Sequence, residues 1–423
     1  MKILWIVNMV FPDVAKEIGI KTSASGGWLL DLAKSIAEFE SIELATFTYY
    51  SGLQYRDIKI NNIRHFIFPG GGKRLLFDSP KTIIDCKKVI EEFKPDLIHI
   101  HGTEYAHSLA ILEAAPNIPK ILTIQGIIKR ISQEYYGGLS IKELLKTIRI
   151  IDFFKLKTIF SYKILYTKNA KREEKILKSV KYVTGRTDWD KVTMLSINPN
   201  LKYFRCNYNL RDEFYKNEKW DITKIQRHKI VTGAGGYSLK GLHILLHALK
   251  IVKLKYPNVK LHIPGGKAEK GKLIVTNGYT NYIKKLILKY NIEENVIFDG
   301  ILSPEEVRKN LLSANVCVVS SAIEGASATI CEAMMVGTPA VCSYRGGMTE
   351  LLTDGINGFT YDFSEYPVLA NKIIQIFEND DLAIKFSKFS MECAIKRHDR
   401  EKNPRDMIKI YKEIFRDEKS RTI

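Results

Sequence analysis

The chain has little cysteine, and none of it is arranged in pairs. Its six cysteines are scattered along 423 residues, with no C-x-x-C motif and no histidines at zinc-ligand spacing. This pattern argues against a disulfide framework and against a zinc site. Several of the cysteines lie in apolar runs, where a reduced thiol behaves as a small hydrophobic side chain. A reducing, cytoplasmic environment fits this usage.

Long apolar runs are also missing. No window of about 18 uncharged apolar residues occurs in the sequence, so we expect no membrane-spanning helix. The N-terminal run Met1–Asn8 contains one lysine, but no small-residue cleavage site follows it. We therefore expect a buried first strand there rather than a signal peptide. Nucleic-acid-binding motifs and short internal repeats are absent as well, which argues against a nucleic-acid partner.

Basic residues outnumber acidic ones, 65 to 47, for a net charge of +18. Such a balance favours nucleic acid, an anionic membrane surface or phosphorylated small substrates as partners. The segment 142–181 concentrates the excess, with twelve Lys or Arg against four Asp or Glu among many large apolar residues. Two interpretations stay open: a face that docks on a membrane surface, or solvated helices whose apolar sides enter the core.

The length requires more than one core, because single cores rarely grow beyond about 250–300 residues. Strand-like and helix-like patterns alternate along the chain, which predicts βαβ units and parallel sheets. We expect a first domain over 1–205, a polar connection over 206–227, a second domain over 228–400 and a C-terminal helix over 401–423.

The expected elements follow from the apolar periodicity. The strands are Ile3–Val10, Ile42–Tyr49, Ile63–Pro69, Leu97–His101, Lys120–Gln125, Lys181–Thr184, His228–Gly233, Val259–Pro264, Val296–Gly300, Val316–Ser320 and Pro339–Ser343. The helices are Gly27–Phe39, Ser79–Phe93, Ile141–Tyr166, Ala170–Ser179, Leu242–Lys255, Asn281–Tyr290, Pro304–Ser313 and Ser327–Val336. Ligands of parallel sheets bind beyond the carboxyl ends of the strands, so the residues directly after each strand are the candidates for a site.

Two carboxylates stand after the expected strand Val316–Ser320. Glu324 lies in the loop, small residues follow it, and Glu332 comes eight residues later, a little more than two helical turns behind. Small residues let backbone amides approach a ligand closely, and a helix N-terminus favours anions. A ligand with many hydroxyls and a phosphate suits this arrangement. The alternative for Glu332 is a local cap or salt bridge.

Three other strand ends carry candidate groups. Lys240 follows the glycine-rich turn Gly233–Gly236, where a cation could offset the charge that builds on a leaving group; the alternative is an ordinary solvent lysine. Gly26 and Gly27 follow the first strand and open a helix. His101 ends the strand Leu97–His101, and His99 alternates with it. We expect His101 to point to the site and His99 to be a core histidine with satisfied hydrogen bonds.

Together these motifs resemble the retaining family-four glycosyltransferases, whose Glu-x7-Glu motif is matched by Glu324 and Glu332. Residues 346–350 and 354–358 continue the family pattern, and the resemblance covers nearly the whole chain. It implies the GT-B fold: an α/β protein with two Rossmann-like domains facing across a cleft, and a C-terminal helix returning toward the first domain.

The resemblance also implies roles for the candidate residues. Glu324 would bind hydroxyls of the donor sugar, and Glu332 would bind the ribose. Lys240 would neutralise the donor diphosphate, and His101 would contact the transferred sugar. The backbone amides expected to bind the donor are those of Gly26, Gly27, Gly325, Ala326, Ser327 and Ala328.

The chain departs from the family pattern at three places. Gly235 stands where an Arg is usual, and Gly325-Ala326-Ser327 replaces Gly-Phe-Gly. Gln125 occupies a position where relatives carry His, and an amide can bond a hydroxyl but cannot be cationic. Arg186 and Arg345 are, by position, the candidates for the missing phosphate clamp.

Asp188-Trp189-Asp190 matches the D-x-D metal motif of another glycosyltransferase class. That motif should end a strand, whereas this one begins a helix in our assignment. No other acidic cluster follows a strand, so we expect neither a metal nor another cofactor.

The expected function is transfer of a hexosyl or N-acetylhexosaminyl group from a nucleotide-diphosphate sugar, in our expectation a UDP-sugar, with retention of configuration. A lipid-linked or oligosaccharide acceptor in surface polysaccharide or glycolipid synthesis would place a cytoplasmic enzyme at the inner face of the cell membrane. Two alternatives stay open: a catalytically impaired sugar-nucleotide-binding subunit, because of Gly235, and another enzyme of this fold, such as a sugar-nucleotide epimerase or a phosphorylase.

Overall fold

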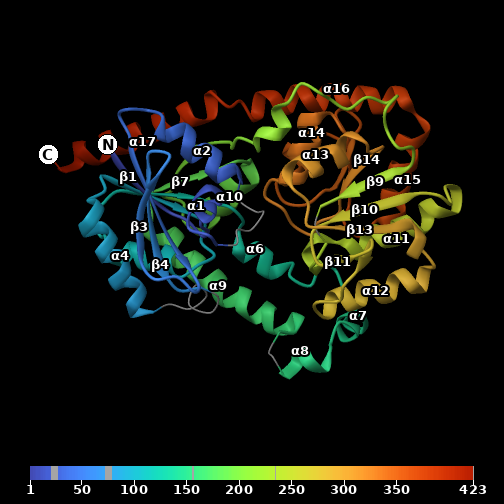
Figure 1. The fold of residues 1–423 in the computed structure, drawn as a ribbon, viewed down its shortest axis with the longest axis horizontal. Coiled ribbons are helices and arrows are strands. Elements are labelled where there is room, and N and C mark those ends of the chain that lie inside the picture. The colour runs from blue at the N-terminus through green and yellow to red at the C-terminus, as the bar shows by residue number, and fades with distance from the viewer. Residues whose placement is uncertain (21–26, 72–78, 155–156, 234, 423) are drawn as a thin grey trace. The chain divides into compact units, whose positions relative to one another are not determined.

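The computed structural model describes residues 1–20, 27–71, 79–154, 157–233 and 235–422. The chain forms two compact units, shown as ribbons in Figure 1. The first unit comprises residues 1–129, 167–209 and 398–423, and the second comprises residues 130–166 and 210–397. The prediction of an α/β protein with two Rossmann-like domains is confirmed, because each unit contains one largely parallel sheet flanked by helices.

The sheet of the first unit has eight strands within the described ranges, in the order β3-β4-β2-β1-β5-β6-β7-β8. All neighbours pair in parallel except β3, which runs antiparallel to β4. The strands are β1 (Lys2–Ile6), β2 (Glu43–Tyr50), β3 (Arg56–Ile60), β4 (Ile63–Pro69), β5 (Leu97–His101), β6 (Lys120–Thr123), β7 (Tyr182–Gly185) and β8 (Lys202–Arg205).

Helices cover both faces of this sheet. Successive side chains of a strand point to opposite faces, so Ile3 and Trp5 of β1 enter one core and Leu4 and Ile6 enter the other. The helices of this unit are α1 (Pro12–Glu17), α2 (Gly27–Ala37), α4 (Pro80–Phe93), α5 (His107–Ala114), the end of α9 (Ile159–Ser179), α10 (Asp188–Ile197) and α17 (Lys402–Thr422). Both faces are therefore apolar, as parallel strands require.

The C-terminal helix α17 belongs to the first unit, as predicted. Its residues Met407, Tyr411 and Ile414 are fully buried in the same core as α2. Tyr411 accepts a hydrogen bond from the indole nitrogen of Trp5 over 3.0 Å. The last helix thus completes the core around the first strand.

The sheet of the second unit has six parallel strands among the described residues, in the order β13-β10-β9-β14-β15-β16. These are β9 (Lys229–Thr232), β10 (Lys260–Pro264), β13 (Val296–Gly300), β14 (Val316–Val319), β15 (Ala340–Ser343) and β16 (Phe359–Tyr361). A short antiparallel pair, β11 (Ala268–Glu269) and β12 (Lys272–Leu273), forms a separate two-stranded sheet that contacts β13. The helices are α6 (Ile128–Gln133), α7 (Ile141–Lys146), α8 (Ile150–Phe154), α11 (Leu242–Lys255), α12 (Gly278–Tyr290), α13 (Pro304–Leu312), α14 (Ala328–Val336), α15 (Tyr366–Glu378) and α16 (Asp380–Arg397).

The expected first domain, 1–205, is wrong in its middle, because residues 130–166 pack in the second unit. The Tyr282 hydroxyl donates to Glu143 over 2.7 Å, and the His243 ring bonds the Gly137 carbonyl over 2.9 Å. These partners are more than a hundred positions apart, so no local sequence pattern shows them.

The single helix expected over Ile141–Tyr166 is also wrong. Helix α7 ends at Lys146, and the next residue, Thr147, bonds the Leu144 carbonyl with its hydroxyl over 2.7 Å. Threonine competes in this way with helix continuation. The segment is therefore divided into α7, α8 and the start of α9.

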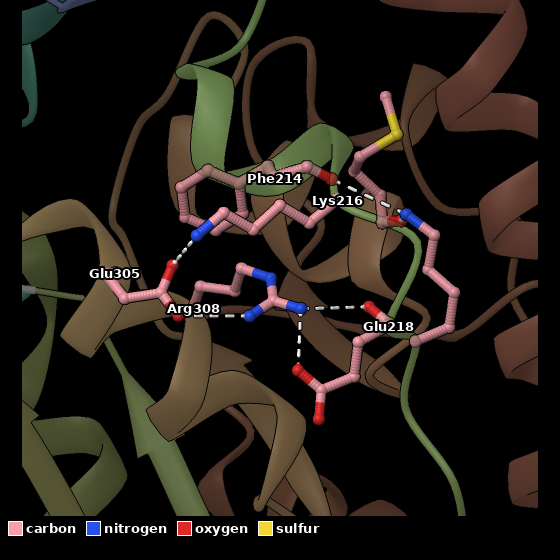
Figure 2. A network of polar contacts seen from close by, with 7 residues as sticks. Phe214, Lys216, Glu218, Glu305 and Arg308 are labelled. Carbon is pink, nitrogen blue, oxygen red and sulfur yellow. Dashed lines mark hydrogen bonds and ion pairs between the residues drawn. The ribbon is translucent and has the colours of Figure 1, made fainter.

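The connection expected over 206–227 is largely packed onto the second unit rather than a free linker. Figure 2 shows its anchor, the buried guanidinium of Arg308 on α13, which donates to Glu218 over 2.8 Å and to Glu305 over 3.2 Å. Lys216 donates to Glu305 over 2.7 Å. Charge-assisted bonds of this kind fix the path of residues 210–220. The same stretch carries Arg211, which belongs to the candidate site.

Candidate active site

The two central strands of the second sheet create a place for a ligand. From β9 the chain first adds β10 on one side and later adds β14 on the other. The loops after β9 and β14 therefore diverge, and the carboxyl ends of these strands border the crevice where open α/β sheets bind ligands. Lys240 follows β9 at the end of the turn Ser238–Lys240, and Glu324 follows β14. The topology brings both predicted residues to one crevice.

Lys240 and Glu324 form an ion pair between Nζ and Oε1. The Ser321 hydroxyl donates to the same carboxylate oxygen over 2.9 Å. Burial alone would lower the pKa of Lys240, but the Glu324 carboxylate, with Tyr237 beside it, outweighs burial and raises the pKa above its ordinary value. The crevice thus holds a permanent cation whose present counter-ion is the carboxylate expected to bind sugar.

Glycines allow the loops to meet at this pair. Gly241 has φ +64°, and a Cβ there would lie 1.7 Å from the Ser320 carbonyl oxygen at the end of β14. Gly346, after β15, has φ +66°, and its Cβ would lie 2.0 Å from the carbonyl oxygen of Glu324. Both contacts are with backbone, so neither position tolerates a side chain. Glycine at these two positions fixes Lys240 and Glu324 relative to each other.

The segment Gly325–Ala328 continues directly from Glu324 into α14. Ser327 is the N-cap, with extended backbone, and its side chain makes no capping hydrogen bond. The first amides of α14 are therefore not capped by that side chain, and the helix dipole favours an anion at this end. The predicted donor-binding residues Gly325, Ala326, Ser327 and Ala328 thus lie in the loop that carries the ion pair.

Glu332 lies inside α14 and is 7% exposed. Arg211 donates to its Oε1 from Nε over 2.9 Å and from Nη2 over 2.6 Å. Burial raises the pKa of Glu332, and Arg211 opposes this effect. The salt-bridge alternative for Glu332 is correct in part, but the partner comes from the connection rather than from its own helix. Both bonds end on Oε1.

The structure gives a reason for glycine at position 235, where the family pattern has Arg. A Cβ at Gly235 would lie 2.6 Å from Cδ2 of the buried Leu242. Of the two candidate clamps, Arg345 is in this unit and directly precedes Gly346, the residue packed against Glu324. Its guanidinium is 3.7 Å from the Asp362 carboxylate. Arg345 therefore lies beside the crevice, whereas Arg186 belongs to the other unit.

The first unit has its own divergence point between β1 and β5, and His101 ends β5 there. Its ring is buried, 4.3 Å from Trp5 and 3.8 Å from His99 between centroids. Burial, with a smaller contribution from His99, lowers the pKa of His101 well below its usual value, so the ring is neutral. Neither ring nitrogen has a hydrogen-bond partner among the described residues.

His99 is the core histidine that the sequence predicts. Its Nδ1 bonds the Tyr411 hydroxyl and its Nε2 bonds the Thr123 hydroxyl, each over 2.5 Å. Gly27 begins α2, as expected, and Gly26 lies outside the described residues. The contrast between the two histidines, one satisfied and one unpartnered, singles out His101 as the one with capacity for a ligand.

Arg186 lies at the carboxyl end of β7, close to the end of β5. It donates from Nη2 to the Gln125 carbonyl over 3.0 Å, and its guanidinium is 4.7 Å from the Tyr208 ring centroid. The Gln125 amide in turn donates to the His101 carbonyl over 3.2 Å. Gln125 thus links the ends of three strands, and it brings Arg186 near His101 within the first unit.

Glu104 is a candidate that sequence reasoning missed. It lies in the loop after β5, and its Oε2 is buried with no hydrogen-bond partner in the part of the chain described. Burial, reinforced by the charge of Glu173, raises the pKa of Glu104 to about 7. Its place three residues beyond a strand end is the signal that could have found it.

The D-x-D pair is a helix cap. Helix α10 begins at Asp188, and the Asp190 carboxylate accepts from the amides of Arg186 and Thr187 over 2.9 and 3.2 Å. The predicted helix start is confirmed.

Within the described residues, no group of three or more His, Cys, Asp or Glu side chains is placed to hold a metal ion. None of the helices described is both long and apolar enough to span a bilayer.

Comparison with known proteins points to one family. Residues 216–392 match the family model of the glycosyl transferases group 1. The chain is 25% identical over 300 residues to the putative glycosyltransferase YtcC of Bacillus subtilis (strain 168), which covers 69% of this chain and 66% of that protein. It is 24% identical over 399 residues to the uncharacterized glycosyltransferase MJ1178 of Methanocaldococcus jannaschii, covering 92% of this chain and 95% of that protein.

A solved structure extends the likeness to nearly the full length. The structure of Anabaena HepE in complex with UDP and glucose matches with a TM-score of 0.69 over 98% of this chain and 100% of that chain. The sequence identity is 17%, so this similarity establishes a common fold.

Proposed function

We propose that this chain is a group 1 glycosyltransferase that transfers a sugar from a UDP-sugar to an acceptor hydroxyl with retention of configuration; the family match over residues 216–392 and the fold shared with HepE support this. The observation that carries the proposal is the Lys240–Glu324 ion pair at the divergence of β9 and β14. A cation, a carboxylate and a helix N-terminus at one strand edge suit a ligand that combines phosphate with hydroxyls. HepE, bound to UDP and glucose, supports UDP as the nucleotide.

In this proposal the donor diphosphate replaces Glu324 as the partner of Lys240. Freed from the ion pair, the Glu324 carboxylate accepts hydrogen bonds from the sugar hydroxyls, while the amides of residues 325–328 approach the diphosphate and sugar. Glu332 holds the ribose through its carboxylate, and Arg211 favours the ionised form of that carboxylate. Each interaction either positions the donor or stabilises negative charge that grows as the diphosphate leaves.

The reaction needs no protein nucleophile. The bond between the anomeric carbon and the diphosphate oxygen breaks, and the acceptor oxygen attacks from the same face. The departing phosphate oxygen takes the acceptor proton, so UDP leaves protonated and charge balances. The neutral, unpartnered ring of His101 would hydrogen-bond the transferred sugar, and Arg186 or Arg345 would supply the charge that the family places at position 235.

The test is release of UDP from UDP-sugars when acceptors are added. Release that depends on acceptor, with a glycoside product of the donor's own anomeric configuration, is expected. UDP binding without turnover for any donor would favour the impaired binding subunit, and change of the sugar nucleotide without acceptor would favour an epimerase.

We also propose that no metal is needed, so activity should survive EDTA. Loss of activity that Mn²⁺ or Mg²⁺ restores would contradict this.

We further propose that the enzyme works at the cytoplasmic face of the cell membrane on a lipid-linked acceptor of surface polysaccharide or glycolipid synthesis. Support comes from residues 141–154 and 157–164, here called the apolar–basic patch. Its exposed apolar side chains are Ile141, Leu145, Ile148, Ile150, Ile151, Phe154, Tyr162 and Ile164. Its exposed basic side chains include Lys142, Lys146 and Lys157. The patch belongs to the second unit, which corrects the expectation that the first domain carries it.

Sedimentation with anionic vesicles tests this location. Basic residues contribute about 1 kcal/mol each near an anionic surface, and the attraction weakens with salt. Phe154, 80% exposed, and Leu254 of α11, 82% exposed, make a matched pair. We expect Phe154→Asp to reduce vesicle binding and Leu254→Asp to leave it unchanged. Equal binding by both variants, or no binding of the wild type at low salt, would contradict a membrane location.

A further inference from the structure

A pocket of about 390 Å³ lies within the second unit, beside the turn that carries Lys240. Residues 236–238 and the start of α12 at 276–279 line it together with Tyr135 and with six residues that follow α7: Thr147, Asp152, Lys157, Thr158, Ile159 and Tyr162. Its volume is in the range that holds a small organic ligand. Neither the ion pair nor Glu332 lines it, so it is separate from the donor-binding residues described above.

Four of the residues that line the pocket are tyrosines. Tyr135, Tyr162, Tyr237 and Tyr279 all contribute to it. The rings of Tyr162 and Tyr237 are 39% and 47% exposed, whereas Tyr279 is fixed by its hydroxyl on His243 over 2.9 Å. Tyrosine offers an apolar face and a polar tip, which suits a ligand with C–H faces and hydroxyl edges.

The buried acid of the pocket has an unused acceptor. Asp152 is 6% exposed, and its Oδ2 has no hydrogen-bond partner among the described residues. Nε of Arg149 lies 3.5 Å from Oδ2, which makes an ion pair rather than a hydrogen bond. A buried carboxylate oxygen without a donor is costly unless a ligand supplies one. Hydroxyl groups are such donors.

The pocket adjoins the reacting end of the proposed donor site. Tyr237 lines the pocket, and its ring centroid is 6.0 Å from Nζ of Lys240. Ser238, in the same turn, also lines the pocket and donates to the Tyr135 carbonyl over 2.7 Å. A ligand here would therefore sit next to the group proposed to hold the departing diphosphate.

We propose that this pocket binds a neutral sugar residue of the acceptor, which Asp152 holds through its hydroxyls and the tyrosines hold through its faces. The inference rests on the proposed glycosyl transfer and names the chemistry of its acceptor. The six lining residues from Thr147 to Tyr162 belong to the apolar–basic patch, so a sugar carried on a membrane lipid would reach the pocket from the side that carries the exposed apolar residues. A lipid-linked and a free glycan share this chemistry.

Binding measurements with simple glycosides test the pocket and distinguish a lipid-linked from a free glycan. Methyl and octyl glycosides of glucose, galactose, N-acetylglucosamine and N-acetylgalactosamine are titrated by saturation-transfer NMR without donor, and UDP is titrated by calorimetry. We expect at least one glycoside to bind, and Asp152→Asn to weaken it about tenfold or more because a charged acceptor is lost. UDP affinity should stay unchanged. Tighter binding of octyl than of methyl glycosides would indicate the lipid-linked source.

A second pocket variant keeps the test valid if Asp152→Asn does not fold. Tyr162→Ala removes a ring that is 39% exposed, and Tyr366→Ala, at 37% exposed, is its control outside the pocket. We expect Tyr162→Ala alone to weaken glycoside binding. Binding of UDP without any glycoside, or glycoside binding that neither pocket variant changes, overturns the acceptor assignment and leaves the proposed function intact. Loss of UDP affinity in Asp152→Asn would assign the pocket to the nucleotide. Failure of the wild type to bind UDP would instead contradict the proposed function.

Discussion

Arg211 donates two hydrogen bonds to one oxygen of Glu332, over 2.9 and 2.6 Å, although the two residues are 121 positions apart. Arg308 hydrogen-bonds Glu218 and Glu305 and so anchors the connection between the two units, in which Arg211 lies. A cation thereby lies beside the buried Glu332 carboxylate and opposes the rise in its pKa that burial causes.

Removing Arg211 should destabilise the protein in a pH-dependent way. The variant Arg211→Met leaves a buried carboxylate without its cation, which costs about 3–5 kcal/mol in comparable cases. The pKa of Glu332 is already raised by burial, and loss of Arg211 raises it further. The carboxyl therefore protonates more readily as pH falls, and the penalty should be largest near pH 8 and smaller near pH 5. Urea unfolding measures it; an equal loss at both pH values would contradict the account.

Glu332→Gln should mainly weaken nucleotide binding. A carboxylate can accept from both ribose hydroxyls, whereas an amide accepts at only one of its two ends. We expect UDP affinity to fall about tenfold in calorimetry, because a charge-assisted bond is lost. Glu306, exposed on α13, provides Glu306→Gln as a control that should bind UDP normally. Normal UDP affinity in Glu332→Gln would return this residue to a purely structural role.

Glu104 should make the wild type less stable as pH rises. Its pKa is raised to about 7 in the folded protein, against about 4.3 in an unfolded chain. A raised pKa favours folding while the group is protonated, and this contribution is lost as pH rises between the two values. Glu104→Gln should therefore be more stable than the wild type at pH 8, by up to about 3.7 kcal/mol, and equal to it at pH 4. Lower stability of the variant at pH 8 would show that the carboxylate is satisfied in the folded state.

For several elements, the first and last residues could be predicted from the sequence. The bounds of Leu97–His101, Leu242–Lys255 and Val296–Gly300 agree with the structure, because apolar runs and turn residues mark both ends. Strand β3, Arg56–Ile60, was missed because it is a largely exposed edge strand without an apolar run. Local patterning reveals an element only when the element buries a face of its own.

The residues of the candidate site could be predicted only where they follow a buried strand. Lys240 and Glu324 were found because each follows a buried strand, and the sheet order then places them together. Arg211 was not found, because it lies in a segment with no period and contacts Glu332 only through tertiary packing. The glycines that fix the loops could be seen as glycines, but the backbone atoms they avoid appear only in the fold.

The central claim is that Lys240 stabilises the departing diphosphate, and turnover of Lys240→Ala tests it most directly. Loss of one preorganised charge stabiliser typically lowers kcat by about 10²–10³-fold. With a UDP-sugar and an active acceptor we expect a fall of this size in Lys240→Ala, partial recovery in Lys240→Arg, and thermal stability close to that of the wild type. A Lys240→Ala enzyme whose kcat stays within about threefold of the wild type would contradict it.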